Sequence, residues 1–219
     1  MKQVKGWWFG TEGRRLAFED NRKIVIGKTH KIKGEIIPCR NGLHFSEKIL
    51  DALSYAPGSI VYRVIGSGTL VPHGNPTDKY ACSERTYVSG GIDISDLLRL
   101  FARKCALDVI HLWEPPDIVV KYLKTGGELI RAAAWDAAGT AWTASDAVSD
   151  AASAAASAAS DAVSVARAAA RAASAASDAA SDAASAAGTA WTASAARAAA
   201  VKKFNRRLTL MVSAAIKGG

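Results

Sequence analysis

Polar residues recur with a strict four-three spacing through the C-terminal part of this chain. They are Asp146, Asp150, Ser153, Ser157, Ser160, Ser164, Arg167, Arg171, Ser174, Asp178, Ser181 and Ser185. A parallel series from 148 to 187, on nearly the opposite side of a helix, is Val148 followed by Ala at every position. A 3.5-residue repeat of this length is typical of helices that wind around one another in a left-handed supercoil. The pattern therefore predicts a long helix whose alanine seam packs on a partner.

A repeated heptapeptide brackets this array. Gly139-Thr140-Ala141-Trp142-Thr143-Ala144-Ser145 recurs unchanged from Gly188 to Ser194, so the two Trp share one heptad position. No Pro or Gly lies between Thr140 and Ala187, so nothing predicts a hairpin there. We expect the seam to mediate self-association, with the two Trp fixing its register. The residues assigned to it are Trp142, Val148, Ala155, Ala162, Ala169, Ala176, Ala183 and Trp191.

Two other interpretations of the Ala-rich segment stay open. It is either a helix without a partner, serving as a spacer, or an ice-binding helix with flat rows of Ala and Thr. Thr is confined to the two heptapeptides, which argues against ice binding. Alanine has the best helix propensity, but a buried methyl group contributes only about 0.8 kcal/mol. An Ala seam therefore gains most when two helix backbones approach closely along their length.

Composition divides the chain and predicts an α+β fold class. Residues 131–200 contain 37 Ala and 11 Ser, whereas nearly all Phe, Tyr, Ile, Leu, His and Cys precede residue 131. Only the first part has the side chains for an ordinary mixed core. We expect a small α+β domain over 1–127, an Ala-rich heptad helix over 128–200, and a basic C-terminal helix or tail over 201–219.

The first part alternates short β-rich runs with turn signals, which predicts an antiparallel meander followed by helices. Strands are expected at 7–9, 16–18, 24–26, 43–45, 59–66, 69–71, 80–82 and 86–88. A helix is expected over 49–56, with Ser46 as its N-cap, and a largely buried helix over 95–113. Asp117 is expected to cap a third helix that stops at Thr125-Gly126-Gly127.

Charge is unevenly distributed along the chain. The net formal charge is +6 over 1–127, −3 over 128–200 and +5 over 201–219. The basic tail contacts phosphates or an acidic partner, or its cations complement a helix dipole. Its residues are Lys202, Lys203, Arg206 and Arg207. A pI of 9.5 keeps nucleic acid among the partners, although it is not favoured. No membrane association is expected, because Asp and Arg interrupt the Ala-rich segment repeatedly.

Three cysteines, Cys39, Cys82 and Cys105, are odd in number and widely spaced. They suggest no disulfide framework, so we expect reduced thiols and a cytoplasmic protein. The N-terminus lacks the continuous apolar stretch of a signal peptide, which agrees with that location. The chain contains no P-loop, dinucleotide fingerprint, HExxH or GxSxG motif, so no cofactor is predicted.

His44 is the first candidate for chemistry. It lies between Leu43 and Phe45 in a strand that leaves a Gly turn, five residues after Cys39. A Cys/His metal site is conceivable, but the spacing matches no compact zinc pattern. A histidine satisfied within the fold, with buried thiols, is the favoured interpretation. No metal is predicted.

The chain resembles two known families. Cys39-Arg40-Asn41-Gly42-Leu43-His44-Phe45, with His111-Leu112-Trp113-Glu114-Pro115-Pro116-Asp117 further on, resembles an uncharacterised family of phage and bacterial proteins with Ala-rich repeats. That resemblance implies a phage or mobile-element origin and supplies no activity. The segment from Gly42 to Ser46, with the helix and strand after it, is similar to the core of ADP-ribosyltransferases. The second resemblance implies NAD as substrate, His44 in the nicotinamide pocket and Glu84 as the catalytic Glu.

These observations favour a non-enzymatic protein that assembles through its Ala-rich helix and displays the α+β domain to a host or virion protein. In a phage setting it acts in the host cytosol. The alternatives are an NAD-consuming transferase using His44 and Glu84, and a nucleic-acid-binding protein using its basic ends.

Overall fold

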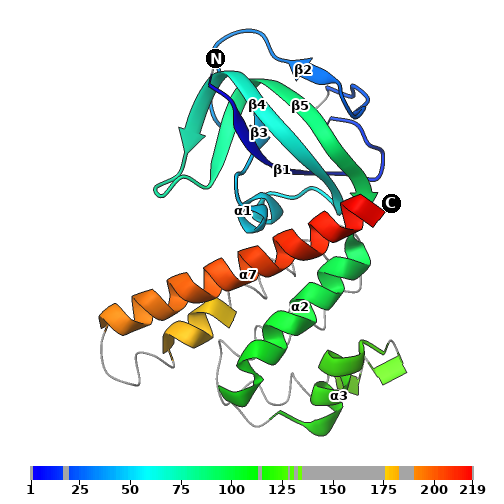
Figure 1. The fold of residues 1–219 in the computed structure, drawn as a ribbon, viewed down its shortest axis with the longest axis vertical. Coiled ribbons are helices and arrows are strands. Elements are labelled where there is room, and N and C mark those ends of the chain that lie inside the picture. Colours follow the sequence, from blue (N-terminus) through cyan, green and yellow to red (C-terminus); the bar gives the residue numbers. More distant parts are fainter. Residues whose placement is uncertain are drawn as a thin grey trace. The chain divides into compact units, whose positions relative to one another are not determined.

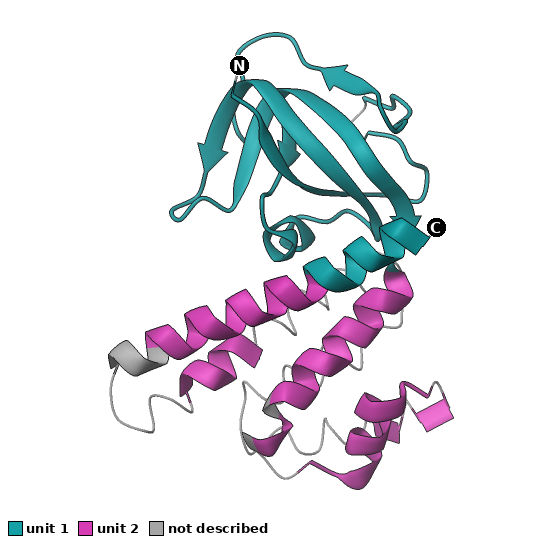
Figure 2. Ribbon diagram, in the orientation of Figure 1, with its two compact units in different colours: residues 1–94, 209–219 teal, residues 95–208 magenta. Residues whose placement is uncertain are grey.

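The computed structural model divides the chain into two compact units (Figure 2). One comprises residues 1–94 and 209–219, and the other comprises residues 95–208. The structure describes residues 2–16, 20–112, 115–127, 129–130, 133–134, 176–182 and 190–218. The strands lie in the first unit and the longer helices start in the second (Figure 1). The mixed α+β class is confirmed.

The first unit contains a five-stranded antiparallel sheet. Its order is β1-β4-β5-β2, and β3 pairs with β5 beside β2 (Figure 1). A long hairpin of two strands dominates it, because β4 and β5 pair from the Ile60–Asp93 end to His73 and Lys79. The strands are β1 (Val4–Gly10), β2 (Thr29–Lys31), β3 (Leu43–Phe45), β4 (Ile60–His73) and β5 (Lys79–Asp93).

A backbone bridge links the first strand to the residue that follows β3. The amide of Trp7 donates to the carbonyl of Ser46 at 2.7 Å, and the amide of Ser46 donates back at 3.1 Å. Pairings therefore run from β1 through β4 and β5 to β3, and return to β1. Register shifts between β4 and β5 bend the hairpin, as bulges do.

Two glycines admit the ring of Phe45 at this closure. A Cβ on Gly6 of β1 would lie 2.5 Å from the ring, and one on Gly66 of β4 would lie 2.2 Å from it. Phe45 is 2 % exposed. The ring can pack here only because Gly6 and Gly66 have no side chain. The rest of this core is Leu16, Ile24, Leu43, Ile60, Tyr62, Val64, Cys82 and Tyr87.

Four helices have defined bounds beside the 3₁₀ turn η1 (Ile110–Leu112). Helix α2 buries an apolar face at the three-four spacing of an amphipathic helix. Helix α3 ends at Gly126, whose φ of 70° suits a left-handed C-cap. The buried face of α2 is Leu98, Phe101, Ala102, Cys105 and Ala106. The helices are α1 (Ile49–Ser54), α2 (Ser95–Val109), α3 (Asp117–Thr125) and α7 (Ala190–Gly218).

Several local predictions need correction. Residues 24–26 form no strand, since Gly27 (φ 84°) and a hydrogen bond from the Lys28 amide to the Val25 carbonyl make a turn there. Ser46 does not cap α1; Lys48 occupies that position, because Ser46 pairs with β1. The two strands expected at 59–66 and 69–71 form one strand, β4. Pro116, rather than Asp117, lies at the N-cap of α3.

The Ala-rich prediction falls mostly outside the described residues. Residues 133–134 and 176–182 are helical, and α7 starts at Ala190, within the second heptapeptide. Helix α7 continues across the expected boundary at residues 200 and 201. The continuous helix from Thr140 to Ala187 stays a prediction.

Replacing Gly66 by Ala tests the closure around Phe45. The added methyl group would overlap the buried ring, so we expect the free energy of unfolding to fall by about 1–3 kcal/mol. Urea denaturation measures this change. Gly13→Ala is the matched control, since its Cβ would meet no atom closer than 4.0 Å. Equal stabilities of the two variants would contradict the packing argument.

Candidate functional site

A buried arginine lies at the centre of the β-sheet unit. Arg85 of β5 is 2 % exposed. Its Nε and Nη2 donate to the hydroxyl of Tyr87 at 3.2 and 2.7 Å, and its Nη1 donates to the carbonyl of His44. Its guanidinium lies 4.2 Å from the ring centre of Trp8. One side chain thus connects β5 with β1 and β3.

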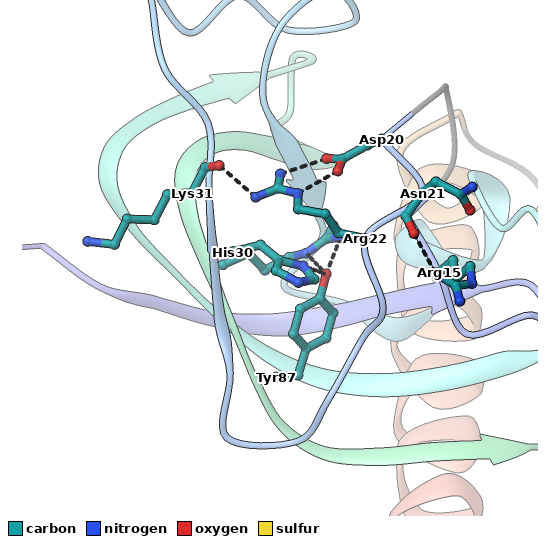
Figure 3. A network of polar contacts seen from close by, with 8 residues as sticks. Arg15, Asp20, Asn21, Arg22, His30, Lys31 and Tyr87 are labelled. Atoms are coloured by element: carbon teal, nitrogen blue, oxygen red, sulfur yellow. Dashed lines mark hydrogen bonds and ion pairs between the residues drawn. The ribbon is translucent and has the colours of Figure 1, made fainter.

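The Tyr87 hydroxyl joins this arginine to His30. Its oxygen accepts from Arg85, so its own proton is available to the Nδ1 of His30, 3.3 Å away (Figure 3). That arrangement leaves the proton of the neutral imidazole on Nε2, which is buried without a hydrogen-bond partner among the described residues. Burial, together with Arg22 and Arg85, lowers the pKa of His30. His30 therefore stays neutral at pH 7.

His44, the first sequence candidate, lies in β3 opposite Ala81 of β5. Its Nε2 accepts a hydrogen bond from the backbone amide of Cys39 at 3.1 Å. Nδ1 therefore carries the proton of the neutral ring. Burial lowers the pKa of His44, and the positive charges of Lys79 and Arg85 lower it further. The imidazole lone pair is thus occupied by the main chain.

Beside His44, a tyrosine, an aspartate and a lysine form a compact group. The hydroxyl of Tyr55 donates to Asp78 Oδ2 at 2.5 Å. The ammonium of Lys79, 8 % exposed, lies 4.0 Å from the centre of the Tyr55 ring. The hydrogen bond to Asp78 raises the pKa of Tyr55 to about 12. We call Cys39, His44, Tyr55, Asp78 and Lys79 the His44 cluster.

Glu84, the other candidate, has different partners. Its carboxylate pairs with Lys31 of β2 at 2.7 Å and accepts from the hydroxyl of Ser67 at 3.3 Å. The hydrogen bond from Lys31 lowers the pKa of Glu84. The described hydrogen bonds and ion pairs do not join Glu84 to the His44 cluster.

The three thiols are dispersed. Cys39 is exposed, at a positive φ of 66°, whereas Cys82 and Cys105 are buried. Burial raises the pKa of Cys82 to about 11 and that of Cys105 to about 12. The two buried thiols are therefore protonated at neutral pH. Across the described part of the chain, no three His, Cys, Asp or Glu side chains form a group that would hold a metal ion.

Of the residues predicted to mediate self-association, only Ala176 and Trp191 lie in described segments. Ala176 of the seam is fully buried, and Asp178 in the same segment pairs with Arg197 of α7 at 3.0 Å. Residues 176–182 thus contact their own chain. Trp191 lies in the first turn of α7. The other assembly residues, Trp142, Val148, Ala155, Ala162, Ala169 and Ala183, lie outside the described residues.

The basic tail belongs to α7, and half of its cations are engaged. Lys203 and Arg207 pair with Asp108 of α2, each at 2.9 Å. These two cations hold the pKa of Asp108 below its usual value, against the effect of burial. Lys202 and Arg206 are exposed. The buried side chains of Phe204 and Leu208 alternate with the cations at helical spacing.

Sequence reasoning found His44 and missed Arg85 and the Tyr55–Asp78–Lys79 group. The signal for Arg85 was a lone Arg just before the strand expected at 86–88, two residues from Tyr87. A cation among aromatic strand residues is a candidate for stacking on a ring. Nothing local indicates that Tyr55 approaches Asp78.

Comparison with known proteins gives a family without an assigned activity. Residues 1–100 match a family model described as a domain of unknown function, DUF7666. The first 100 residues are therefore similar to an uncharacterised domain family. This domain contains all five strands, the His44 cluster and Arg85. No curated protein and no solved structure matched the chain. In the described residues, no helix is both long and apolar enough to cross a membrane.

Replacing Arg85 by Met tests its role in the sheet. The change leaves the partly buried carbonyl of His44 without its Arg85 donor and removes the stacked cation from Trp8. We expect a loss of about 2–4 kcal/mol in the free energy of unfolding, measured by urea denaturation. Arg14→Met, at an exposed position, should stay within about 0.5 kcal/mol of wild type. A similarly small effect at Arg85 would refute the assignment.

His30 and His44 predict a pH dependence of stability. Their folded pKa values lie below the unfolded value of about 6.5, so the unfolded chain binds more protons below that pH. Stability is therefore complete above pH 6.5 and falls as the pH drops below it. His44→Gln, whose amide oxygen still accepts from Cys39, should flatten this dependence between about pH 5.5 and 7.

Thermal unfolding across that range measures the effect. His111→Gln, at an exposed residue of η1, is the control and should retain the wild-type profile. An unchanged profile for His44→Gln would show that His44 titrates alike in the folded and unfolded states.

Proposed function

We propose that this protein is a non-enzymatic interaction protein that assembles copies of itself through its Ala-rich helix and displays the α+β domain to a protein partner. The observation that carries the proposal is the four-three spacing of polar residues opposite an Ala series between positions 146 and 187. Such a repeat is maintained when one face of a long helix packs on another helix. Joining several copies raises avidity without a strong single site.

The state of the candidate reactive groups supports a binding role. In the His44 cluster, the imidazole accepts from the main chain and the Tyr55 hydroxyl is bonded to Asp78. A general base needs a free lone pair and a pKa near the working pH. The lowered pKa of His44 and the raised pKa of Tyr55 both favour the neutral forms of these groups at pH 7.

The resemblance to phage and bacterial proteins supports a phage-encoded protein that acts in the host cytosol. The family match over residues 1–100 agrees with a separate displayed domain followed by the Ala-rich segment. The proposed partner is a host or virion protein that contacts the domain. The basic charge of residues 1–127, net +6, favours an acidic surface on that partner.

Substitutions in the seam test the assembly. We expect the full-length protein to be an oligomer by light scattering after size exclusion, and Ala155→Glu with Ala169→Glu to convert it to monomers, because carboxylates cannot be buried in a close Ala seam. The matched control, Ser153→Glu with Ser174→Glu, changes the polar series and should leave the oligomer intact.

Two results would contradict the proposal. A wild-type chain that is monomeric at all concentrations would show that the Ala helices pack within one chain. NAD turnover that disappears in folded His44→Gln or Glu84→Gln variants would show that the domain is an enzyme instead.

A further inference from the structure

The stretch from residue 14 to residue 33 of the β-sheet unit contains several cations that form no ion pair with a described acid. The described acid within it, Asp20, is engaged by Arg22 at 2.5 Å. Glu84 of β5 is engaged by Lys31, and Glu19 lies outside the described residues. The remaining cations are all exposed and form no ion pair with a described residue: Arg14, Arg15, Lys23, Lys28 and Lys33. We call this set the basic hairpin surface.

Backbone pairing arranges two of these cations side by side. The amide of Leu16 donates to the Arg22 carbonyl at 3.0 Å, and that of Ile24 donates to the Arg14 carbonyl at 2.9 Å. The two segments form an antiparallel bridge in which Arg15 lies opposite Lys23. Like charges directly opposite one another destabilise a strand pair. An anion bound across them would remove this cost.

The buried side of the two bridged segments, 14–16 and 22–24, determines which side chains point outward. Leu16 and Ile24 are 7 and 5 % exposed and belong to the core of the unit. Side chains alternate along a strand, so Arg15 and Lys23, their neighbours in sequence, lie on the solvent side. The cations are therefore presented on a surface anchored by buried residues.

Arg22 holds the second of the two bridged segments against β2. Its guanidinium donates to both carboxylate oxygens of Asp20, at 2.5 and 2.6 Å, and to the carbonyl of Lys31 in β2 at 3.1 Å (Figure 3). One guanidinium nitrogen of Arg15 donates to the Asn21 carbonyl at 2.8 Å. The hydrogen bond from Arg22 lowers the pKa of Asp20, so the Asp20–Arg22 pair persists at neutral pH. The other donors of Arg15 remain available to a ligand.

We propose that the basic hairpin surface binds the phosphate backbone of duplex nucleic acid without sequence preference. The bridge places Arg15 and Lys23 side by side on the solvent-facing side, and a DNA duplex carries one charge for about every 1.7 Å of its axis. Several cations of this surface can therefore meet phosphates together.

An anionic membrane fits the same surface less well. The exposed apolar side chains beside the cations are those of Val25 and Ile26 at the adjacent turn, 47 and 46 % exposed. Two exposed aliphatic side chains offer little area for insertion between lipids, whereas membrane-bound helices present a whole apolar face. The cations therefore supply most of the binding, which favours a ligand dense in phosphates such as duplex DNA.

Fluorescence anisotropy of labelled duplex DNA with the full-length protein tests this assignment. Between about 50 and 200 mM salt, contacts to four phosphates predict a loss of affinity of roughly 100-fold. Arg15→Glu with Lys23→Glu should weaken binding at the lower salt by at least about tenfold and reduce the slope of log affinity against log salt by about 2. Arg15→Gln with Lys23→Gln repeats the test without reversed charges, and thermal unfolding confirms that each variant folds.

Two matched controls locate the site. Lys2→Glu with Lys5→Glu makes the same change in net charge at exposed positions near the N-terminus, and it should retain the slope. Lys202→Glu with Arg206→Glu makes the same change on α7 and should also retain it. Equal weakening by either control, or unchanged binding by the hairpin variant, would overturn the proposal. Binding to anionic phospholipid vesicles but not to DNA would overturn it as well.

Discussion

The β-sheet unit depends on a guanidinium that is buried among aromatic rings, a hydroxyl and a carbonyl. Removing such a cation from water is costly unless its donors are satisfied. Arg85 meets this condition through Tyr87, the main chain at His44 and the face of Trp8. These partners come from β5, β3 and β1. The contacts that compensate the buried charge of Arg85 therefore also hold β1, β3 and β5 together.

This arrangement also determines what the neighbouring groups can do. Because β3 is held through its carbonyl at His44, the imidazole stays beside the Cys39 turn and accepts from its amide. The Lys79 ammonium, placed on the Tyr55 ring, disfavours a second positive charge on that imidazole. The His44 imidazole and the Tyr55 hydroxyl are thus both engaged in hydrogen bonds within the His44 cluster. The lone pair of the His44 imidazole, which a general base would need to be free, is therefore occupied by the Cys39 amide.

Sequence reasoning succeeded where a local pattern determines the structure. The apolar spacing of α2 and the β-branched run of β4 are local signals, and so is the Gly126 stop after α3. Sequence reasoning failed where contacts between segments that are distant in sequence determine the structure. Ser46 is an ordinary helix cap in sequence, but its backbone pairs with Trp7 of β1. Of the candidate site, the Gly-Leu-His-Phe segment indicated His44, whereas the burial of Arg85 depends on Trp8 and Tyr87 together.

Strand β2 limits pairing at one edge of the sheet. β2 is the last strand in the order β1-β4-β5-β2, and it has only three residues. The side chain of Arg22 already occupies the Lys31 carbonyl. A short border with a blocked acceptor is a poor template for an incoming strand. Pairing of the sheets of two molecules is therefore disfavoured at the β2 edge.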